Sequence, residues 1–380
     1  MANAKRVGDI DFWRGAVLVA ILVDHIPGNV LESFTPRNYG LSDSSEAFVF
    51  ISGLSVGMVY APRALSRGFA TVARGCLQRA LKLYGAHIAL TLSALAIFAF
   101  AFWVSGVDEL IQAHGRSYVF EQPAAGLAGL AFLTHQLGYF NILPLYIVLM
   151  LWAPVALALA MRDVRLALAV SVGIYVASRT YGLHLPNWPE PGAWFFNPFA
   201  WQLVFTMGLV SAVIWRKGPP RADMGLIATS LVLLALAAFV ATNAAGAAPG
   251  LRDATFSRLD LAKQDLGLAR LVHFAALAYL ISVAPQVAPQ MKRIVDSAAG
   301  RAVQRLGRNG LAVFAAGCVI TALAQAALGA GQPYFSAGVE QLAGLAYTLA
   351  GLAALFALAR WIECRNTSVP PSAMVPSGAV

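Results

Sequence analysis

The chain contains about ten long apolar segments, each close to the length that an α-helix needs to cross a lipid bilayer, ~20 mostly apolar residues. They lie at residues 11–30, 45–62, 79–104, 138–161, 164–181, 198–215, 223–243, 267–288, 309–329 and 339–362. Segment 164–181 is the weakest, and 124–137 is apolar but short, so we expect a re-entrant or interfacial piece there. The pattern predicts an all-α, polytopic integral membrane protein with about ten transmembrane helices.

The composition agrees with lipid as the solvent for much of the surface. Of the 380 residues, 59% are hydrophobic and 12% are charged, whereas soluble domains carry roughly 25% charged residues. The net charge is +9, but the basic residues alternate with apolar segments, which argues against binding of nucleic acid. The three cysteines, Cys76, Cys318 and Cys364, have neither metal-site nor disulfide spacing. We therefore expect no metal site and no tightly bound cofactor.

The distribution of basic residues predicts the orientation, because cytoplasmic loops collect Lys and Arg. With the N-terminus in the cytoplasm, 19 of the 27 basic residues fall in or beside inside loops, and seven lie in outside loops or helix ends. We therefore expect a multi-pass protein of the bacterial inner (cytoplasmic) membrane with both termini in the cytoplasm. No cleavable signal peptide precedes the first segment, which should remain in the mature protein.

The domain organisation is predicted to be simple. No internal repeat, Walker loop or GxGxxG motif interrupts the apolar segments, so we expect one transmembrane domain over residues 1–365. Residues 366–380 are rich in Ser, Pro and Val, and we expect them to form a disordered tail.

The first segment carries ionisable residues, which are costly in lipid and usually functional. Arg14 and His25 are eleven positions apart, so in a helix they point the same way to within ~20° and lie ~16 Å apart. Asp24 does not share that face. Two simpler readings stay open: His25 as a structural histidine bonded to a neighbouring helix, and Arg14 as an interfacial residue that snorkels and pairs with Asp11.

Other polar residues fall at the predicted outer ends of their helices. These are Glu46 in the second segment, Arg179 in the fifth, Asn197 and Gln202 in the sixth, and Arg270 and His273 in the eighth. Because these polar residues from several helices lie at one depth in the membrane, they predict a polar cavity in the outer half of the protein. His87 lies at the other level and is predicted to be structural. His114, His135 and His184 lie in or near outside loops, where they could touch a substrate, but they are predicted to be surface residues.

The sequence resembles the OpgC family of membrane proteins, which succinylate osmoregulated periplasmic glucans and belong to the wider acyltransferase family 3-like enzymes. The likeness extends to about residue 362. The residues that carry it are Asp11-Phe12-Trp13-Arg14-Gly15, Asp24-His25-Ile26-Pro27-Gly28-Asn29, Phe34-Thr35-Pro36-Arg37-Asn38-Tyr39-Gly40-Leu41-Ser42-Asp43, Glu46-Ala47-Phe48-Val49-Phe50-Ile51-Ser52-Gly53, Leu145-Tyr146-Ile147, Asn197-Pro198-Phe199-Ala200-Trp201-Gln202, Arg270-Leu271-Val272-His273-Phe274 and Leu306-Gly307-Arg308-Asn309-Gly310.

The resemblance implies an O-acyltransferase of the succinyltransferase type. It implies transfer of an acyl group from cytoplasmic acyl-CoA, with succinyl-CoA as the expected donor, to hydroxyls of periplasmic glucans. The Arg-x10-His pair of the superfamily implies a catalytic role for His25. Two departures are Ser44-Ser45, where small Ala-type residues are expected, and the loop 244–264, which matches little. The acceptor can therefore differ from that of the best-known members.

In the hypothesis for the site, His25 is the general base, and the remaining residues are assigned roles around it. Asp24 or Glu46 would orient the imidazole. Asn197, Gln202 or His273 would donate to the oxyanion. Substrate would be bound by Arg14 along the donor path, by Arg37 in the outer loop, and by Arg179 or Arg270 at the free carboxylate of a succinyl group. The partners expected are the glucan, the acyl-CoA and membrane lipid; a homodimer is one option for the oligomeric state.

Basic residues near the inner ends could hold the phosphates of the donor. They are Arg74, Arg79, Lys82, Arg216, Lys217, Arg301, Arg305 and Arg308, and positive-inside topology alone would also explain them. No serine or cysteine lies in a recognisable nucleophile motif, so direct attack by the acceptor hydroxyl is expected.

Two alternatives stay open. About ten spans with charges inside the membrane also suit a carrier for a glycan or a small anion, although carriers often show broken helices in matching halves, which this sequence lacks. The second alternative is an acyltransferase that uses acetyl or another acyl group on a different polysaccharide.

Overall fold

The structure is a computed structural model that describes residues 2–216, 218, 220–242 and 250–368. Within these ranges the regular elements are helices, and one isolated bridge joins Pro186 and Ala193. Long helices occupy the ten predicted segments: α1 (Ala2–His25), α2 (Ser44–Arg67), α3 (Phe69–Ser105), α7 (Ile142–Arg162), α8 (Val164–Tyr181), α9 (Pro198–Trp215), α10 (Met224–Thr242), α12 (Leu268–Val287), α15 (Gly310–Gly331) and α16 (Ala337–Ser368). The predicted all-α fold is confirmed.

Eight of the helices in the described part of the chain are long and apolar enough to cross a membrane. The two remaining long helices are α1 and α8. Charged residues lie along α1 and near both ends of α8, which makes them less apolar. Both pack among the spanning helices: α1 contacts α2 and α15, and α8 contacts α7 and α9. The chain is therefore a polytopic membrane protein, with α1 and α8 at the predicted first and fifth segments.

Short helices occupy the connections. They are η1 (Val30–Phe34), η2 (Pro36–Asn38), α4 (Glu109–Gln112), η3 (Ala113–Gly115), α5 (Ser117–Glu121), α6 (Pro123–Ala131), α11 (Leu251–Phe256), α13 (Pro289–Asp296) and α14 (Ala298–Arg308). The apolar piece at 124–137 forms α6, whose nine residues are too few to span. Its last carbonyl oxygen, on Ala131, accepts a bond of 2.8 Å from the Tyr84 hydroxyl on α3. A re-entrant or interfacial position for it stays a prediction.

Two of the sequence predictions reach beyond the described residues. Residues 366–368 continue α16, and residues 369–380 of the predicted disordered tail lie outside the described part. Lys217, one of the basic residues near the predicted inner ends, also lies outside it.

Two helix crossings require glycine. On α14, a Cβ at Gly307 would lie 1.9 Å from the Asp11 oxygen, so this glycine lets the backbones of α1 and α14 touch. On α2, a Cβ at Gly53 would lie 1.9 Å from the Phe205 oxygen of α9. The first crossing brings the α14 backbone against Arg14, and the second anchors α2 in the core.

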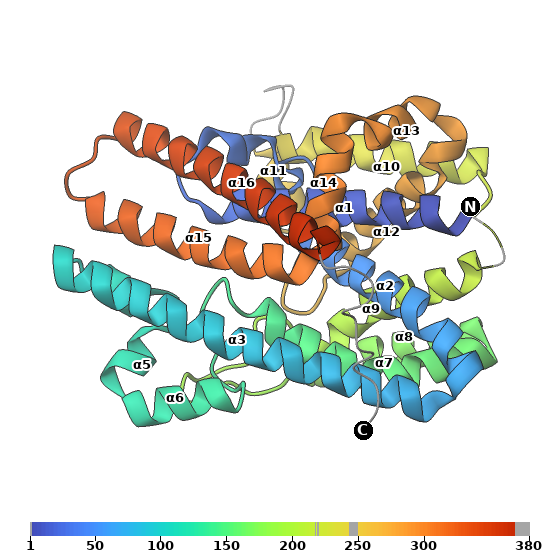
Figure 1. The fold of residues 1–380 in the computed structure, drawn as a ribbon, viewed down its shortest axis with the longest axis horizontal. Coiled ribbons are helices and arrows are strands. Elements are labelled where there is room, and N and C mark those ends of the chain that lie inside the picture. The colour runs from blue at the N-terminus through green and yellow to red at the C-terminus, as the bar shows by residue number, and fades with distance from the viewer. Residues whose placement is uncertain (1, 217, 219, 243–249, 369–380) are drawn as a thin grey trace.

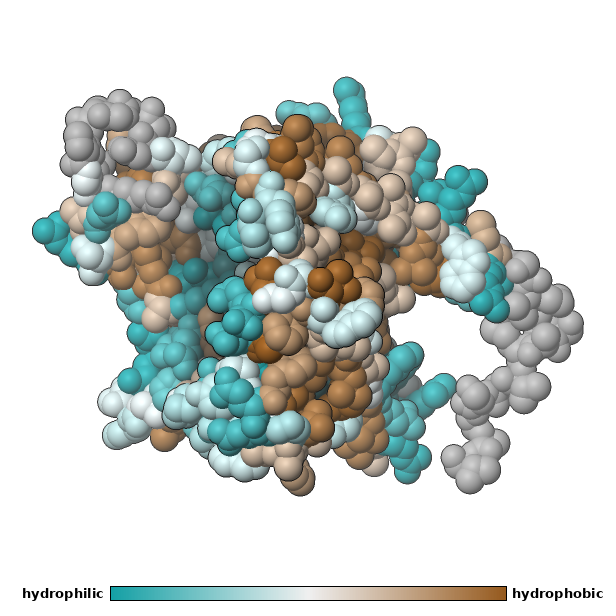
Figure 2. Space-filling model, turned by 90° about the vertical axis from the view of Figure 1, so that its left-hand side faces the viewer, coloured by the Kyte–Doolittle hydropathy of each residue, from teal (hydrophilic) through white to brown (hydrophobic). Residues whose placement is uncertain are grey.

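The arrangement of the helices leaves α15 and α16 as an antiparallel pair on one side of the molecule, with α3 running along another side (Figure 1). α1 and α15 run in the same direction, since Arg14 lies against Gly310 and His25 against Gln325. Figure 2 looks onto the end where α15 turns into α16; hydrophilic residues gather on one side there, and apolar residues run through the middle.

Candidate active site

Arg14 joins three helices near the middle of α1. Its guanidinium donates to Asp11 on α1 at 2.8 Å and to the main-chain oxygen of Gly307 on α14 at 3.0 Å. It also donates to the hydroxyl of Ser55 on α2. The pairing with Asp11 agrees with the snorkelling reading, but the contacts with α2 and α14 hold the head group inside the protein rather than at its surface.

Arg14 lines a cavity of about 510 Å³. Arg79 on α3 and Arg308 on α14 line the same cavity, so three guanidinium groups face one space. The apolar part of the wall includes Phe48 and Phe314. The volume lies within the range of cofactor and small-molecule sites, about 300–1,000 Å³, and the charge of the wall favours an anionic ligand.

His25 lines a second, much narrower hollow, with space of about 10 Å³, enough for about one water molecule. Its walls come from three helices: Leu18, Ile21 and Leu22 on α1, Val313, Phe314, Gly317, Cys318 and Thr321 on α15, and Leu355 on α16. Phe314 belongs to both hollows. The two spaces are therefore adjacent along the α1–α15 contact, with Arg14 in the wide one and His25 in the narrow one.

The ring of His25 contacts aromatic side chains rather than carboxylates. The ring of Tyr139 meets it edge-on, with centroids 4.9 Å apart, and the same tyrosine ring meets that of His114 with centroids 5.0 Å apart. Neither ring nitrogen of His25 takes part in a hydrogen bond with another described residue. Charged groups close enough to act on it electrostatically are Lys263, Asp43 and Arg37. The imidazole is thus held by packing, and its nitrogens remain available to a ligand.

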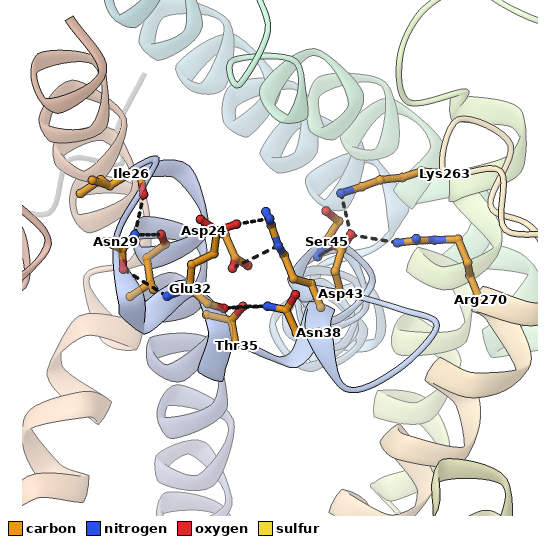
Figure 3. A network of polar contacts seen from close by, with 12 residues as sticks. Asp24, Ile26, Asn29, Glu32, Thr35, Asn38, Asp43, Ser45, Lys263 and Arg270 are labelled. Carbon is orange, nitrogen blue, oxygen red and sulfur yellow. Dashed lines mark hydrogen bonds and ion pairs between the residues drawn. The ribbon is translucent and has the colours of Figure 1, made fainter. Parts of the chain in front are cut away.

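Asp24 does not orient His25 in this structure. Its carboxylate faces Arg37, with 3.9 Å between Oδ1 and Nε, and Arg37 also pairs with Glu32. Asp24 and Glu32 lie close together in Figure 3. Asn29 closes this outer corner: its side-chain nitrogen donates to the oxygens of Val23 and Ile26 at the end of α1. Arg37 and Asp24 therefore stabilise the loop that follows α1.

Glu46 does not contact His25 either. It is fully buried, and its Oε1 accepts from Arg270 Nε on α12 at 2.7 Å. Its Oε2 accepts from the backbone nitrogen of Asp43 at 2.9 Å, while Asp43 Oδ1 accepts from Ser45 N, which together form a capping box at the start of α2. The predicted orientation of the imidazole by Asp24 or Glu46 is therefore not seen, because both carboxylates are bound by arginines.

Asp43 is the centre of a cluster with Glu46, Lys263 and Arg270, called the outer charge cluster because it lies at the helix ends predicted to face the periplasm. Its Oδ2 accepts from Lys263 Nζ at 2.7 Å and from Arg270 at 3.0 Å (Figure 3). Burial acts to raise the pKa of this carboxyl, but the two cations outweigh burial and hold the pKa well below its usual range. Asp43 is therefore ionised at neutral pH and fixes both cations, of which Lys263 is close enough to act electrostatically on His25.

His273 lies beside this cluster. Its Nδ1 is 2.8 Å from the Ser42 hydroxyl, and Gly40 packs against the ring so closely that a Cβ there would lie 2.4 Å from Nε2. The side chain is buried. His273 thus connects α12 to the loop before α2.

Three other predicted site residues tie α8, α9 and the loop before α12 together. Arg179 binds Asp260 at 2.7 Å and the oxygen of Asp265 at 2.8 Å. Asn197 caps α9 and donates to the Asp265 carboxylate at 2.9 Å. Gln202 exchanges bonds of 2.6 and 2.8 Å with Ser171 on α8. The predicted outer residues therefore do not line one common cavity. Arg179, Asn197 and Gln202 bind neighbouring helices and loops, whereas His25 lines a separate hollow.

A sequence model of the family described as "OpgC protein" matches residues 6–367. The chain belongs to the OpgC family. No curated protein and no solved structure gave a significant match.

Membership in the OpgC family points to an acyltransferase that acts on periplasmic glucans, in a membrane protein of apolar helices. The match covers both hollows and the outer charge cluster. Arg14, His25, Asp43, Glu46 and Arg270 all lie within the matched residues.

Sequence reasoning missed four residues near His25. The spacing Asp43-x-x-Glu46 is that of a capping box and could have identified Asp43. Lys263 lies in a loop that carried no motif. Tyr139 meets His25, and His114 meets Tyr139, only through the fold. His114 was predicted to be a surface residue, and it is exposed, but its ring also meets that of Tyr139 edge-on. The same prediction is wrong for His135, which is buried.

Proposed function

We propose that this protein transfers an acyl group from cytoplasmic acyl-CoA to a hydroxyl of a periplasmic glucan, with His25 as general base and succinyl as the acyl group. The observation that carries the proposal is the pair of adjacent hollows that share Phe314. One is wide and lined by arginines; the other is narrow and lined by the candidate base.

The wide cavity suits the donor. Arg14, Arg79 and Arg308 face it, and guanidinium groups bind phosphate oxygens in bidentate fashion. Arg79 and Arg308 also belong to the helix ends predicted to face the cytoplasm, where acyl-CoA is available. Tyr60, Ser52 and Asn309 add hydroxyl and amide groups to the wall.

The narrow hollow suits the thioester arm. Its wall of aliphatic side chains follows α1 and α15 from Leu18 to His25, so an extended chain entering past Phe314 would bring its carbonyl to the imidazole. The space of about 10 Å³ is smaller than such a chain. The Phe314 ring, which packs on Phe48 with centroids 5.6 Å apart, must therefore swing aside when the donor binds.

The proposed chemistry needs one proton carrier. A ring nitrogen of His25 accepts the proton of a sugar hydroxyl while the hydroxyl oxygen attacks the thioester carbonyl. The tetrahedral intermediate expels the CoA thiolate, which takes that proton, so the products are a glucan ester and free CoA. Direct transfer requires no covalent enzyme intermediate. A general base needs a ring nitrogen that is free to accept the proton of the hydroxyl. Neither ring nitrogen of His25 is bound to a described residue, which fits this role.

The test uses purified full-length protein in liposomes with acyl-CoA and a glucan, and ester formation is measured by mass spectrometry. We expect His25→Ala to lower the rate by about 10²–10⁴-fold. The matched control is His184→Ala, since His184 is a half-buried histidine of an outer loop that does not line either hollow. Near wild-type transfer by His25→Ala would remove His25 from the mechanism.

The same liposomes separate this proposal from a carrier. Acyl-CoA is placed outside and glucan inside, and then the reverse. An acyltransferase forms ester across the bilayer in one of the two arrangements, whereas a carrier moves solute without forming ester. Ester with acetyl-CoA and none with succinyl-CoA would keep the reaction class and replace the acyl group.

A further inference from the structure

Arg116, between η3 and α5, is a buried cation without a carboxylate partner among the described residues. The residue is 5% exposed. Its Nε donates to the Leu110 oxygen at 2.7 Å and one NH2 donates to the Glu109 oxygen at 3.3 Å. The guanidinium carbon lies 3.9 Å from the centroid of the Phe98 ring on α3. A stacked ring and two carbonyls therefore hold the charge in place without neutralising it.

An unpaired buried charge is unfavourable unless something binds it. Burial lowers the pKa of Arg116 to about 10, against the opposite influence of Glu109 and Tyr139, so the group remains charged at neutral pH. Arginine has five N–H donors, and the remaining donors of Arg116 have no acceptor within the described part of the chain. Such a preformed fork matches the geometry of a carboxylate.

This cation lies next to the ring contacts of His25. Arg116 is near enough to act electrostatically on both Tyr139 and His114, and the ring of Tyr139 contacts the rings of both His114 and His25. Two non-glycine residues here have positive φ, 71° at Tyr139 and 59° at His114, which is uncommon and concentrates at functional sites. Gly138 N donates to the His114 oxygen at 3.0 Å and joins the two loops.

The cations that the sequence suggested for the free carboxylate of a succinyl group are already paired. Arg179 binds Asp260, and Arg270 binds Asp43 and Glu46. Lys263 is also bound to Asp43, and Arg37 to Glu32. Arg116 differs from these four outer cations in having no ion pair with a described residue.

We propose that Arg116, with the Tyr139 hydroxyl, binds the free carboxylate of a dicarboxylic acyl group and so selects succinyl-type over acetyl-type donors. This inference rests on the proposed function. In a succinyl thioester, two methylene groups separate the carboxylate from the reacting carbonyl. With the carbonyl at His25, an acyl chain that extends toward the Tyr139 ring, which contacts His25, brings this carboxylate toward Tyr139 and the neighbouring Arg116. Neither the Tyr139 hydroxyl nor the remaining donors of Arg116 bind a described residue, so each has a donor left for a carboxylate.

The test compares two donors on the same purified, full-length protein. Transfer from succinyl-CoA and from acetyl-CoA to glucan is measured as kcat/KM for wild type, Arg116→Gln and Arg116→Lys. We expect Arg116→Gln to lower the succinyl value by about 10- to 100-fold, the effect of losing a charged hydrogen bond, and to leave the acetyl value within about threefold. Arg116→Lys, which keeps the charge but loses the fork, should recover part of the selectivity.

The controls separate binding from folding. Arg258→Gln removes an exposed cation from another outer loop and should leave the succinyl-to-acetyl ratio unchanged. If Arg116→Gln lowered kcat/KM equally for both donors, Arg116 would have a structural role and the inference would be overturned. The same holds if neither value changed, because the succinyl-to-acetyl ratio would then be that of the wild type. Wild-type protein that forms ester from neither donor would instead reject the proposed function, so the two failures are distinguishable.

Discussion

Gln325 on α15 donates a hydrogen bond from Nε2 to the main-chain oxygen of His25, 2.7 Å away. That oxygen belongs to the last residue of α1, where carbonyl groups have no partner within the helix. The bond therefore holds the end of α1 against α15 at the narrow hollow. It fixes the main chain of the candidate base and leaves the ring nitrogens free for a substrate.

Gln325→Leu keeps the side-chain volume and removes this bond. We expect kcat for ester formation to fall about tenfold, because the base is displaced from the donor path, while KM for acyl-CoA changes little. The loss of stability should be about 1 kcal/mol. Gln332→Leu, at the exposed end of α15, is the matched control. An unchanged kcat in Gln325→Leu would mean that the bond does not position His25.

Arg14→Ala should raise KM for acyl-CoA by about tenfold or more, because a cation is lost from the wall of the wide cavity. Arg14→Lys should retain partial activity, since a point charge remains without the fork that binds Asp11, Ser55 and Gly307. Steady-state kinetics at varied concentrations of acyl-CoA measure KM and kcat for both variants and check these two predictions. Arg67→Ala removes an exposed cation from α2 as a control. Full activity of Arg14→Ala would favour a snorkelling residue without a role in donor binding.

Phe314 separates the two hollows, so its size should control passage between them. Phe314→Trp is expected to lower the rate of acyl transfer about tenfold or more while binding of the CoA part in the wide cavity persists. Phe314→Leu should allow transfer at the wild-type rate or above. Single-turnover transfer and equilibrium binding of CoA measure the two steps separately. If Phe314→Trp lost CoA binding and acyl transfer equally, the acyl chain would not pass at this residue. Phe100→Leu, on the exposed face of α3, serves as the control.

The outer charge cluster predicts a pH dependence of stability. The pKa of Asp43 is lower in the folded protein than its unfolded value of about 3.9. Its contribution to the free energy of unfolding is therefore complete above pH ~4 and is lost as pH falls toward the folded pKa. Asp43→Asn should lower stability at pH 7 by about 1–3 kcal/mol and should reduce the further loss on acidification.

Thermal unfolding in detergent between pH ~7 and pH ~3 measures this difference. The control is Asp108→Asn, because Asp108 precedes α4 without forming a side-chain cap. An acid-induced loss of stability that is the same in wild type and Asp43→Asn would assign the pH dependence to other carboxylates.

The α2–α9 crossing should not tolerate a side chain at Gly53. Gly53→Ala places a methyl group on the Phe205 oxygen, so we expect α2 to be displaced, together with Ser55 and Glu46, and both stability and activity to fall. Gly85→Ala on α3 is the matched control, because a Cβ there meets no heavy atom within 4 Å, and alanine favours a helix. Similar expression and melting temperature for the two variants would contradict the close packing.

The sequence was a good guide wherever the signal was local. Apolar length predicted all ten long helices, although α3 begins ten residues before the predicted segment. The spacing of Arg14 and His25 predicted that one helix face would carry both, and in the structure they line adjacent hollows. Helical periodicity is a property of neighbouring residues, so it can be read without knowing which helices meet.

The sequence was a poor guide to the partners of the charged residues. Glu46 was expected to serve His25, but it binds Arg270, which is 224 residues away in the chain. Asn197 and Gln202 were expected to serve the oxyanion and instead hold α8, α9 and a loop together. Depth in the membrane predicts which residues share a level, whereas bonds of about 3 Å depend on the rotation and crossing of each helix.

The sequence alone determined a polytopic helical membrane protein of the OpgC type with Arg14 and His25 on one face of its first helix, because apolar length, charge bias and helical spacing act locally. Only the tertiary structure decided that Phe314 separates a wide hollow from a narrow one. It also decided that Tyr139 contacts both His25 and His114, and that Arg116 is a buried cation without an ion pair among its described neighbours. These relations arise where helices and loops distant in sequence pack together, and no local pattern encodes which side chains meet there.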